Sequence, residues 1–272
     1  MHLRLCRLIL TSLLVAGALL PLSVAAADPE MPPQISAYWH RDVQHWNDII
    51  VEEATQRGLD PDLIAAVIWK ESLGRSYTRS PAGAVGLMGI MPREAGFGWR
   101  PTAAQLQDPA TNVFWGTRTL SIIIGQAHGD LYRALAAYNG GWAQADQDGP
   151  RRYAASVLDS YAQAVTLRYG LPAGGHWVVT IAAMGSPDIV TVIRPQHTIA
   201  RYTHRPVLAD IPEVTTSGPP TVVVFYPTDG RHMDSCVGMW ISMDGALVRQ
   251  PREPLSTWLT TGRGPQSPLP AP

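Results

Sequence analysis

The sequence predicts an α+β protein of two domains, in which an all-helical domain is followed by a small antiparallel β sandwich or barrel. Apolar residues recur at helical spacing over residues 41–172, where Asp and Gly are placed as helix starts and stops. Beyond Pro172 the pattern changes to short β-branched or alternating runs bounded by Gly, Pro and Asp. The 272 residues suffice for two modest domains.

The first 27 residues have the pattern of a secretory signal peptide. Arg4 and Arg7 precede an apolar run over 8–20, and small residues end at Ala27, where we expect cleavage. An uncleaved membrane anchor is the alternative, but the apolar run is short for one. A Pro-rich linker is expected over 28–40. The protein is therefore predicted to be secreted, either periplasmic or on the exterior of the cell envelope.

Charge and cysteine content exclude several classes of function. Loss of Arg4 and Arg7 with the leader widens the excess of 22 acidic over 21 basic residues, so nothing favours nucleic-acid binding. Cleavage also removes Cys6 and leaves Cys236 alone, which rules out an intramolecular disulfide and predicts a small buried residue there. The histidines lack ligand spacing, so neither a metal site nor a cofactor is expected.

Five helices separated by short capped turns are predicted for the helical domain, residues 41–172. They are expected over 41–56, from the Asp60–Pro61 cap to Gly74, from the Asp108–Pro109 cap to Gly129, from Asp130 to Gly140, and over 150–169. Because their apolar faces can satisfy one another, we expect this domain to fold without the region that follows.

The β domain is predicted over 173–261, with a disordered tail over 262–272. Strands are expected over 177–183, 189–194, 221–226 and 237–243. Asp244–Gly245 fits a hairpin turn after the last of these. The region has no recognisable motif, so it could contact the cell wall, another protein or the helical domain.

Glu71 is the candidate catalytic residue. It follows Val67 by four positions and Ile64 by seven, which places its carboxyl on the apolar face near the helix C-terminus. Desolvation and the negative end of the helix dipole both raise the pKa of a carboxyl there. A general acid at neutral pH needs such a pKa. The alternative is that Glu71 lies at the edge of the apolar face and that its carboxyl reaches water.

Three sequence blocks resemble the soluble lytic transglycosylase (SLT) domain. They are Glu71–Ser72, the stretch over 80–92 with sequence SPAGAVGLMGIMP, and the stretch over 136–141 with sequence AAYNGG. The resemblance covers about residues 41–169. It implies an all-helical, lysozyme-like fold, and a substrate that is the glycan strand of peptidoglycan.

The resemblance also implies a mechanism with one carboxyl group. Glu71 would protonate the oxygen of the MurNAc–GlcNAc β-1,4 bond and then take the proton of the muramic acid 6-hydroxyl, which gives a 1,6-anhydro product. Intramolecular attack has a large effective-molarity advantage, which explains how a second carboxylate can be absent.

Further positions match the family's substrate-binding or supporting residues, namely Ser72, Ser80, Met88, Gly89, Met91, Tyr138, Asn139 and Tyr153. Five of them have an alternative structural role: Ser72 as a cap, Ser80 and Asn139 as turn residues, and Met91 and Tyr153 as core residues.

Gly89 departs from the family pattern, because a glutamine that donates to a substrate acetamido group usually stands there. If position 89 lies in the subsite, Gly89→Gln should restore that hydrogen bond and lower KM. If Gly89 has a positive φ, glutamine should instead destabilise the fold.

Two other functions remain open. A hydrolase like goose-type lysozyme would need a further carboxylate, for which Glu94, Asp146 and Asp148 are candidates. A glycan-binding protein that has lost turnover is the third hypothesis, which Gly89 favours and Glu71 with Ser80 oppose.

Overall fold

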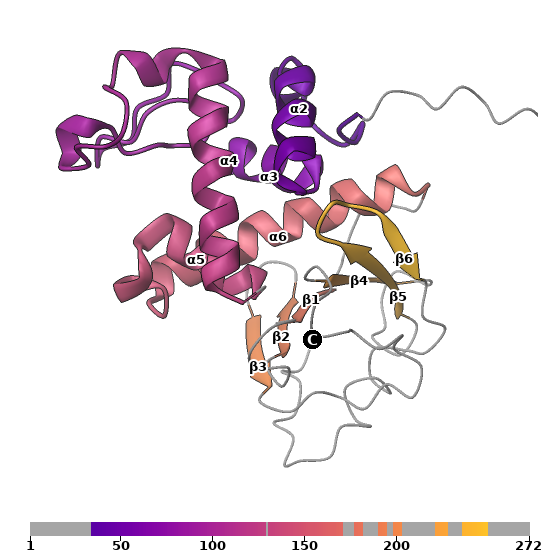
Figure 1. Ribbon diagram of the computed structural model, residues 1–272. Helices are drawn as coiled ribbons and strands as arrows, with labels where there is room; N and C mark the ends of the chain where they lie inside the picture. Colours follow the sequence, from indigo (N-terminus) through magenta and orange to yellow (C-terminus); the bar gives the residue numbers. More distant parts are fainter. Residues whose placement is uncertain are drawn as a thin grey trace, which may run out of the picture. The chain divides into compact units, whose positions relative to one another are not determined.

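The computed structural model describes residues 34–128 and 130–170, six strands between 177 and 249, and the side chains of 241–246 (Figure 1). The predicted signal peptide, the start of the predicted linker and the predicted C-terminal tail lie outside the described residues, as does the side chain of Cys236. No helix in the described part combines the length and the apolar character that crossing a bilayer requires.

The region from 34 to 170 is all helical, as predicted. Its α-helices are α1 (Arg41–Gln44), α2 (Asn47–Arg57), α3 (Pro61–Ser72), α4 (Pro109–Gln126), α5 (Leu131–Gly140) and α6 (Asp148–Arg168). Short 3-10 helices lie at Arg93–Ala95, Gln105–Gln107 and Trp142–Gln144.

The first predicted helix is in fact two helices, α1 and α2. The chain leaves helical geometry at Trp46, which has φ −99° and ψ 11° and precedes α2. The Trp46 indole N–H donates to the Gly74 carbonyl at 2.8 Å. A hydrogen bond to a distant residue thus accompanies the break in a segment whose apolar spacing is helical throughout.

The predicted helix starts are confirmed. Asp60, Asp108 and Asp130 each occupy the N-cap position and accept a hydrogen bond from a backbone N–H two or three residues further on. Such a cap stabilises a helix by about 1 kcal/mol. Pro61 and Pro109 stand at the first helical position, where their missing N–H costs no hydrogen bond.

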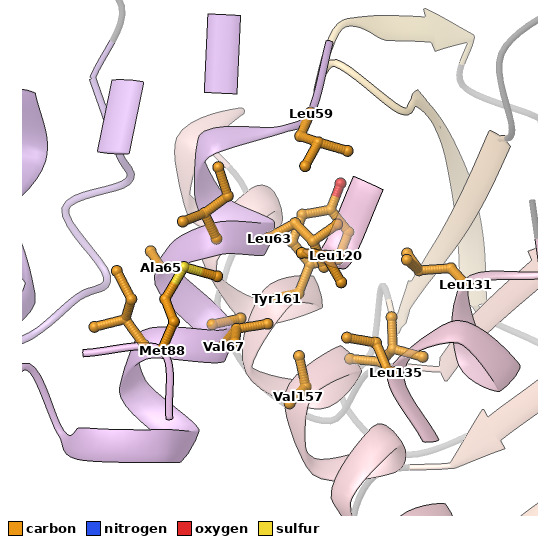
Figure 2. Packing of buried hydrophobic residues seen from close by; sticks show 14 of the residues in the cluster. Leu59, Leu63, Ala65, Val67, Met88, Leu120, Leu131, Leu135, Val157 and Tyr161 are labelled. Atoms are coloured by element: carbon orange, nitrogen blue, oxygen red, sulfur yellow. The ribbon is translucent and has the colours of Figure 1, made fainter. Parts of the chain in front are cut away.

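Helix α3 is enclosed by the rest of the helical domain. Its residues 63–68 are at most 1% exposed, so this part of the helix is buried on every side. The sequence had predicted an apolar stripe along one side only. Figure 2 shows the surrounding side chains, among them Leu120 of α4, Leu135 of α5 and Val157 of α6. Burying each Leu, Ile or Val contributes about 1.5–3 kcal/mol. The helix that carries Glu71 is therefore held firmly in place.

Residues near the start of the described chain join this core. Ile35 and Trp39, from the stretch predicted as linker, are each 4% exposed. The Trp39 indole N–H donates to Asp62 Oδ1 at 2.7 Å, and the Ser36 backbone N–H donates to the same oxygen at 2.8 Å. The segment over 34–40 therefore packs as part of the helical domain.

Four strands, β1, β2, β4 and β5, lie where the alternating pattern predicts strands. The described residues also form two further strands, β3 and β6. The strands are β1 (Trp177–Ile181), β2 (Val190–Arg194), β3 (Thr198–Tyr202), β4 (Thr221–Pro227), β5 (Cys236–Ser242) and β6 (Leu247–Arg249). Each neighbouring pair is antiparallel, in the order β3-β2-β1-β4-β5-β6. The predicted sandwich or barrel depends also on residues outside the described ones and stays a prediction.

The turn between β5 and β6 contacts the helical domain. Ile241 is 0% and Met243 6% exposed, and both belong to the core that surrounds α3. The Met243 carbonyl accepts the backbone N–H of Asp60 at 2.6 Å. Gly245 has φ +88°, and a Cβ on it would overlap the Asp60 carboxylate. Residues of this turn therefore cover part of the apolar surface at the start of α3. That the helical domain folds without them stays a prediction.

Candidate active site

Glu71 lies in the last turn of α3 and is partly exposed. The Tyr153 hydroxyl, which comes from α6, donates to Glu71 Oε1 at 2.6 Å. Tyr153 is only 7% exposed, so this donor is fixed by the packing of α6 against α3. Tyr153, which was expected to be a supporting residue, thus contacts Glu71 directly.

The environment favours the neutral form of the Glu71 carboxyl. Burial raises the pKa of Glu71, while the Tyr153 hydrogen bond and the charge of Lys70 lower it by less. Among the described residues no ion pair includes Glu71. A carboxyl with a raised pKa can hold a proton near neutral pH and release it to a substrate.

Tyr138 of α5 is the second tyrosine beside the acid. Its hydroxyl donates to the Met88 carbonyl at 2.8 Å. Burial, followed by the nearby Glu71 charge, raises the pKa of both Tyr138 and Tyr153. Both hydroxyls therefore stay protonated and act as neutral donors near Glu71.

The turn over 86–89 lies directly against the acid. Gly89 has φ +62°, the left-handed region, and a Cβ built on it would overlap Glu71 Oε2. The Glu71 carboxyl thus occupies the space that any side chain at position 89 would need. This geometry disfavours the simple gain of a substrate hydrogen bond that Gly89→Gln was expected to give.

Asn112, which the sequence analysis missed, holds this turn in place. Its side chain accepts from the Met88 N–H at 2.8 Å and donates to the Val85 and Leu106 carbonyls at 2.8 and 2.9 Å. It is 0% exposed, and a Cβ on Gly86 would overlap it. The available signal was an amide within the otherwise apolar face of α4.

Two of the predicted supporting side chains, Ser72 and Ser80, form hydrogen bonds with backbone groups. Ser72 is buried, and its hydroxyl lies 2.9 Å from the Leu87 carbonyl and accepts the Gly74 N–H. The Ser80 hydroxyl accepts the Ala84 N–H at 3.0 Å within a turn. These contacts match the alternative roles, a cap and a turn residue, and no described hydrogen bond joins either serine to Glu71.

The remaining predicted residues differ in burial. The Met88 side chain is 0% exposed and packs against α4 at Gly116, so only its backbone reaches the site. Met91 is partly exposed, and Asn139 is exposed. The structure therefore brings Glu71, Gly89, Tyr138 and Tyr153 together and leaves Asn139 at the surface.

Comparison with known proteins identifies the domain. The profile of the transglycosylase SLT domain matches residues 48–157, inside the stretch where the sequence blocks lie. Residues 48–157 form an SLT domain. The matched range holds Glu71, the turn over 86–89, Tyr138 and Tyr153.

Curated relatives share this SLT domain. The chain is 36% identical over 89 residues to "Membrane-bound lytic murein transglycosylase E" of Buchnera aphidicola, covering 30% of this chain and 40% of the relative. It is 37% identical over 102 residues to "Transglycosylase" of Enterobacteria phage PRD1, covering 37% of each. The chain thus spans about two fifths of the length of these relatives.

A solved structure of a related protein is also similar. It is an inactive mutant of the lytic transglycosylase Slt from Pseudomonas aeruginosa, 31% identical, with a TM-score of 0.39. The likeness covers 46% of this chain and 24% of that one.

The carboxylates that a hydrolase would need are exposed. Glu94 is exposed, and its Oε2 accepts the backbone N–H of Ala103 at 3.1 Å. Asp146 and Asp148 are exposed. None makes a described contact with Glu71. Within the described residues, no three His, Cys, Asp or Glu side chains gather as a metal site would require.

Proposed function

We propose that this protein is a peptidoglycan lytic transglycosylase of the cell envelope, with Glu71 as its single catalytic carboxyl. One observation carries the proposal: a partly buried carboxyl with a raised pKa lies between two neutral tyrosine hydroxyls in an SLT domain. Several relatives are membrane-bound lytic murein transglycosylases, which agrees with it. The predicted leader agrees with an envelope location.

The first step uses the neutral form of Glu71. Because Oε1 accepts the Tyr153 hydrogen bond, we place the transferable proton on Oε2, the oxygen next to Gly89. That proton passes to the oxygen of the MurNAc–GlcNAc β-1,4 bond as the bond from C1 to this oxygen breaks. Tyr153 then stabilises the carboxylate left behind.

The second step needs no water. The 6-hydroxyl oxygen of the muramoyl residue bonds to C1, and its proton returns to the Glu71 carboxylate. The products are a 1,6-anhydromuramoyl end and a free 4-hydroxyl, and the acid is regenerated. Because the attacking hydroxyl belongs to the same sugar, its effective molarity reaches about 10⁵–10⁸ M in favourable geometries.

Mass spectrometry of muropeptides after digestion of purified sacculi tests the proposal. Anhydro ends are expected. Reducing ends would indicate a hydrolase and would contradict the single-carboxyl mechanism. Unchanged sacculi that retain bound protein would indicate a glycan-binding protein without turnover.

A further inference from the structure

A pocket of about 440 Å³ lies between the segment over 93–108 and the first half of α4. It is lined by Arg93, Trp99, Arg100, Pro101, Gln105, Asp108, Thr111 and Trp115. The catalytic steps proposed above use none of these residues. Two tryptophans and two arginines in one pocket suit a ligand with both apolar surface and negative charge.

The tryptophans form an aromatic corner. The Trp99 and Trp115 ring centroids are 5.7 Å apart at an interplanar angle of 45°. Trp99 is 63% exposed, an unusual degree for so large an apolar side chain. A ligand that covers the exposed ring would gain the burial that the protein itself does not provide.

The arginines supply the charge. The Arg100 guanidinium lies 4.8 Å from the Trp99 ring centroid and 4.5 Å from that of Phe97, which orients it. Arg93 donates through Nε to the Arg100 carbonyl at 3.2 Å, and no hydrogen bond of the described residues uses its terminal nitrogens. The one lining carboxylate, Asp108, already accepts the Thr111 N–H as a helix cap. The pocket therefore has a net positive charge.

Arg100 connects this pocket to the candidate active site. Its Nη1 donates to the Met91 carbonyl at 3.2 Å, and its charge acts on the Tyr138 hydroxyl, which borders Glu71. A group bound in the pocket would thus be near a glycan strand held at Glu71.

We propose that this pocket binds the acidic stem peptide of the strand that is cleaved at Glu71, with carboxylates on Arg93 and Arg100 and methyl groups on Trp99. The inference rests on the proposed function. Where the muramoyl lactyl groups are amide-linked to stems, the N-acetylated glycan itself has no charge, so the arginines find carboxylates on the peptide stems. A four-residue stem extends to about 13 Å, which allows it to reach from a muramoyl unit at the site into a neighbouring pocket.

Calorimetric titration of the full-length Glu71→Gln protein with free stem tetrapeptide tests the pocket without requiring turnover. Trp99→Ala and Arg93→Gln, each added to Glu71→Gln, should weaken binding at least tenfold. Amidation of the peptide carboxylates should weaken it similarly. Trp142→Ala is the matched control, because Trp142 is also an exposed tryptophan with an arginine over its ring, and it should leave binding unchanged.

A second readout uses the protein with Glu71 intact. It compares kcat/KM on peptide-bearing strands with kcat/KM on peptide-free strands, expressed as a ratio. Trp99→Ala and Arg93→Gln should lower this ratio. Absent or undiminished binding, or equal loss in the Trp142→Ala control, would overturn the pocket assignment. If peptide binds as expected but no strand is cleaved, the proposed function fails and the pocket assignment stands.

Discussion

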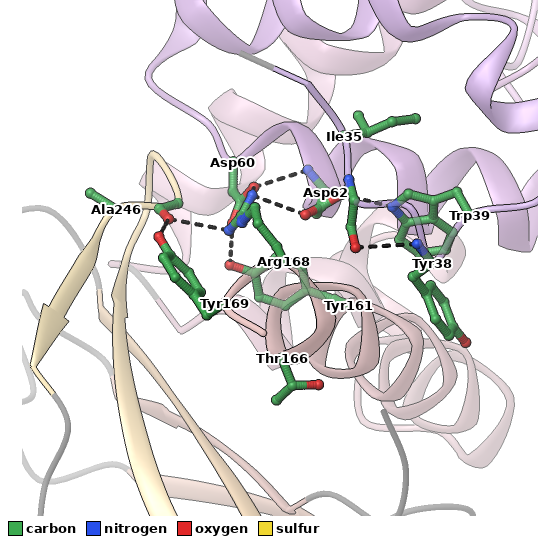
Figure 3. A network of polar contacts seen from close by, with 12 residues as sticks. Ile35, Tyr38, Trp39, Asp60, Asp62, Tyr161, Thr166, Arg168, Tyr169 and Ala246 are labelled. Carbon is green, nitrogen blue, oxygen red and sulfur yellow. Dashed lines mark hydrogen bonds and ion pairs between the residues drawn. The ribbon is translucent and has the colours of Figure 1, made fainter. Parts of the chain in front are cut away.

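The two ends of helix α3 hold buried carboxyl groups in opposite surroundings. At the N-terminal end, Asp60 and Asp62 share a cation, since Arg168 lies 2.7 Å from Asp60 Oδ2 and 2.9 Å from Asp62 Oδ2 (Figure 3). Tyr161 donates to Asp60 as well, at 2.7 Å. At the C-terminal end, Glu71 accepts the hydroxyl of neutral Tyr153, and no ion pair among the described residues includes it.

The helix dipole strengthens this contrast. Negative charge is favoured at a helix N-terminus, where Asp60 caps the chain, and disfavoured at the C-terminus, where Glu71 lies. The aspartates with Arg168 are a structural ion-pair network, because their charges compensate one another. A partly buried carboxyl that forms no ion pair is instead suited to hold and transfer a proton. The partners of these carboxyls therefore favour a structural role for the two aspartates and agree with the proposed role of Glu71.

The contrast predicts that Glu71→Gln abolishes cleavage and leaves stability nearly unchanged. The amide keeps the shape of the side chain but has no proton to transfer, and general acid–base help contributes about 10²–10⁴ in rate. Release of anhydro-muropeptides measures the loss, and Asp146→Asn, at an exposed carboxylate, should retain full activity. Activity within tenfold of the parent would contradict a single-acid mechanism.

At the other end of α3, Arg168→Met should destabilise the fold by about 3–5 kcal/mol, because it leaves two buried aspartates without their cation. Thermal or urea unfolding measures this change. The control is Arg41→Met, which removes a surface ion pair of a side chain that is 88% exposed and should cost less than about 1 kcal/mol. Equal effects from both variants would show that the network is dispensable.

Tyr153→Phe should lower kcat about 10- to 100-fold, because a hydrogen bond to an ionised carboxyl is worth about 1.5–3 kcal/mol. Loss of the donor disfavours the carboxylate and raises the pKa of Glu71 further. The limb of the kcat/KM profile on which activity falls with rising pH should therefore move to higher pH. Tyr138→Phe, whose hydroxyl donates to the Met88 carbonyl, should not move it. If the pH profile of kcat/KM does not shift in Tyr153→Phe, Tyr153 does not influence the pKa of Glu71.

The raised pKa of Asp62, at the N-terminal end of α3, predicts that the stability of the fold depends on pH. Burial, and then the charge of Asp60, raises the pKa of Asp62 to about 6, against the lowering effect of Arg168. Because the pKa of Asp62 is higher in the folded than in the unfolded chain, protonation of Asp62 stabilises the fold. This contribution to the free energy of unfolding is complete below about pH 4 and is lost as the pH rises through 6. The loss amounts to a few kcal/mol at most, since one pKa unit corresponds to about 1.4 kcal/mol. Asp62→Asn should flatten Tm across this range, and an unchanged slope would contradict the assignment.

Gly89→Ala should have the smallest effect on stability, about 1 kcal/mol, from the strain of a side chain at positive φ. It should also reduce cleavage, because its Cβ displaces the Glu71 carboxyl. Gly83→Ala is the matched control, since Gly83 has φ +91° but open space around it. Both variants should lose similar stability, and only Gly89→Ala should lose activity. Equal activity in the two would show that the carboxyl position tolerates displacement.

Local signals account for the parts of the fold that could be predicted. The caps at Asp60, Asp108 and Asp130 depend on residues a few positions away, which a sequence window contains. The break at Trp46 depends on the carbonyl of Gly74, 28 residues away, so the apolar spacing of 41–56 could not indicate it.

The same distinction applies to the candidate site. Helical periodicity placed Glu71 on a buried face, but its partner Tyr153 lies 82 residues away, and only the resemblance to a family pointed to that tyrosine. Asn112 was missed because its role is defined by three backbone groups of the folded chain. The positive φ of Gly89 likewise depends on the turn that surrounds it.

The hairpin turn that covers the start of α3 also bears on how the chain folds during synthesis. Helix α3 precedes by a long stretch of chain the Met243 carbonyl that its cap residue binds. The Gly245 carbonyl that Arg168 binds is likewise made 77 residues after Arg168. Contacts of such long range slow folding, because chain closure must precede them. The start of the helix that carries Glu71 therefore reaches its final environment only after the turn between β5 and β6 has been made.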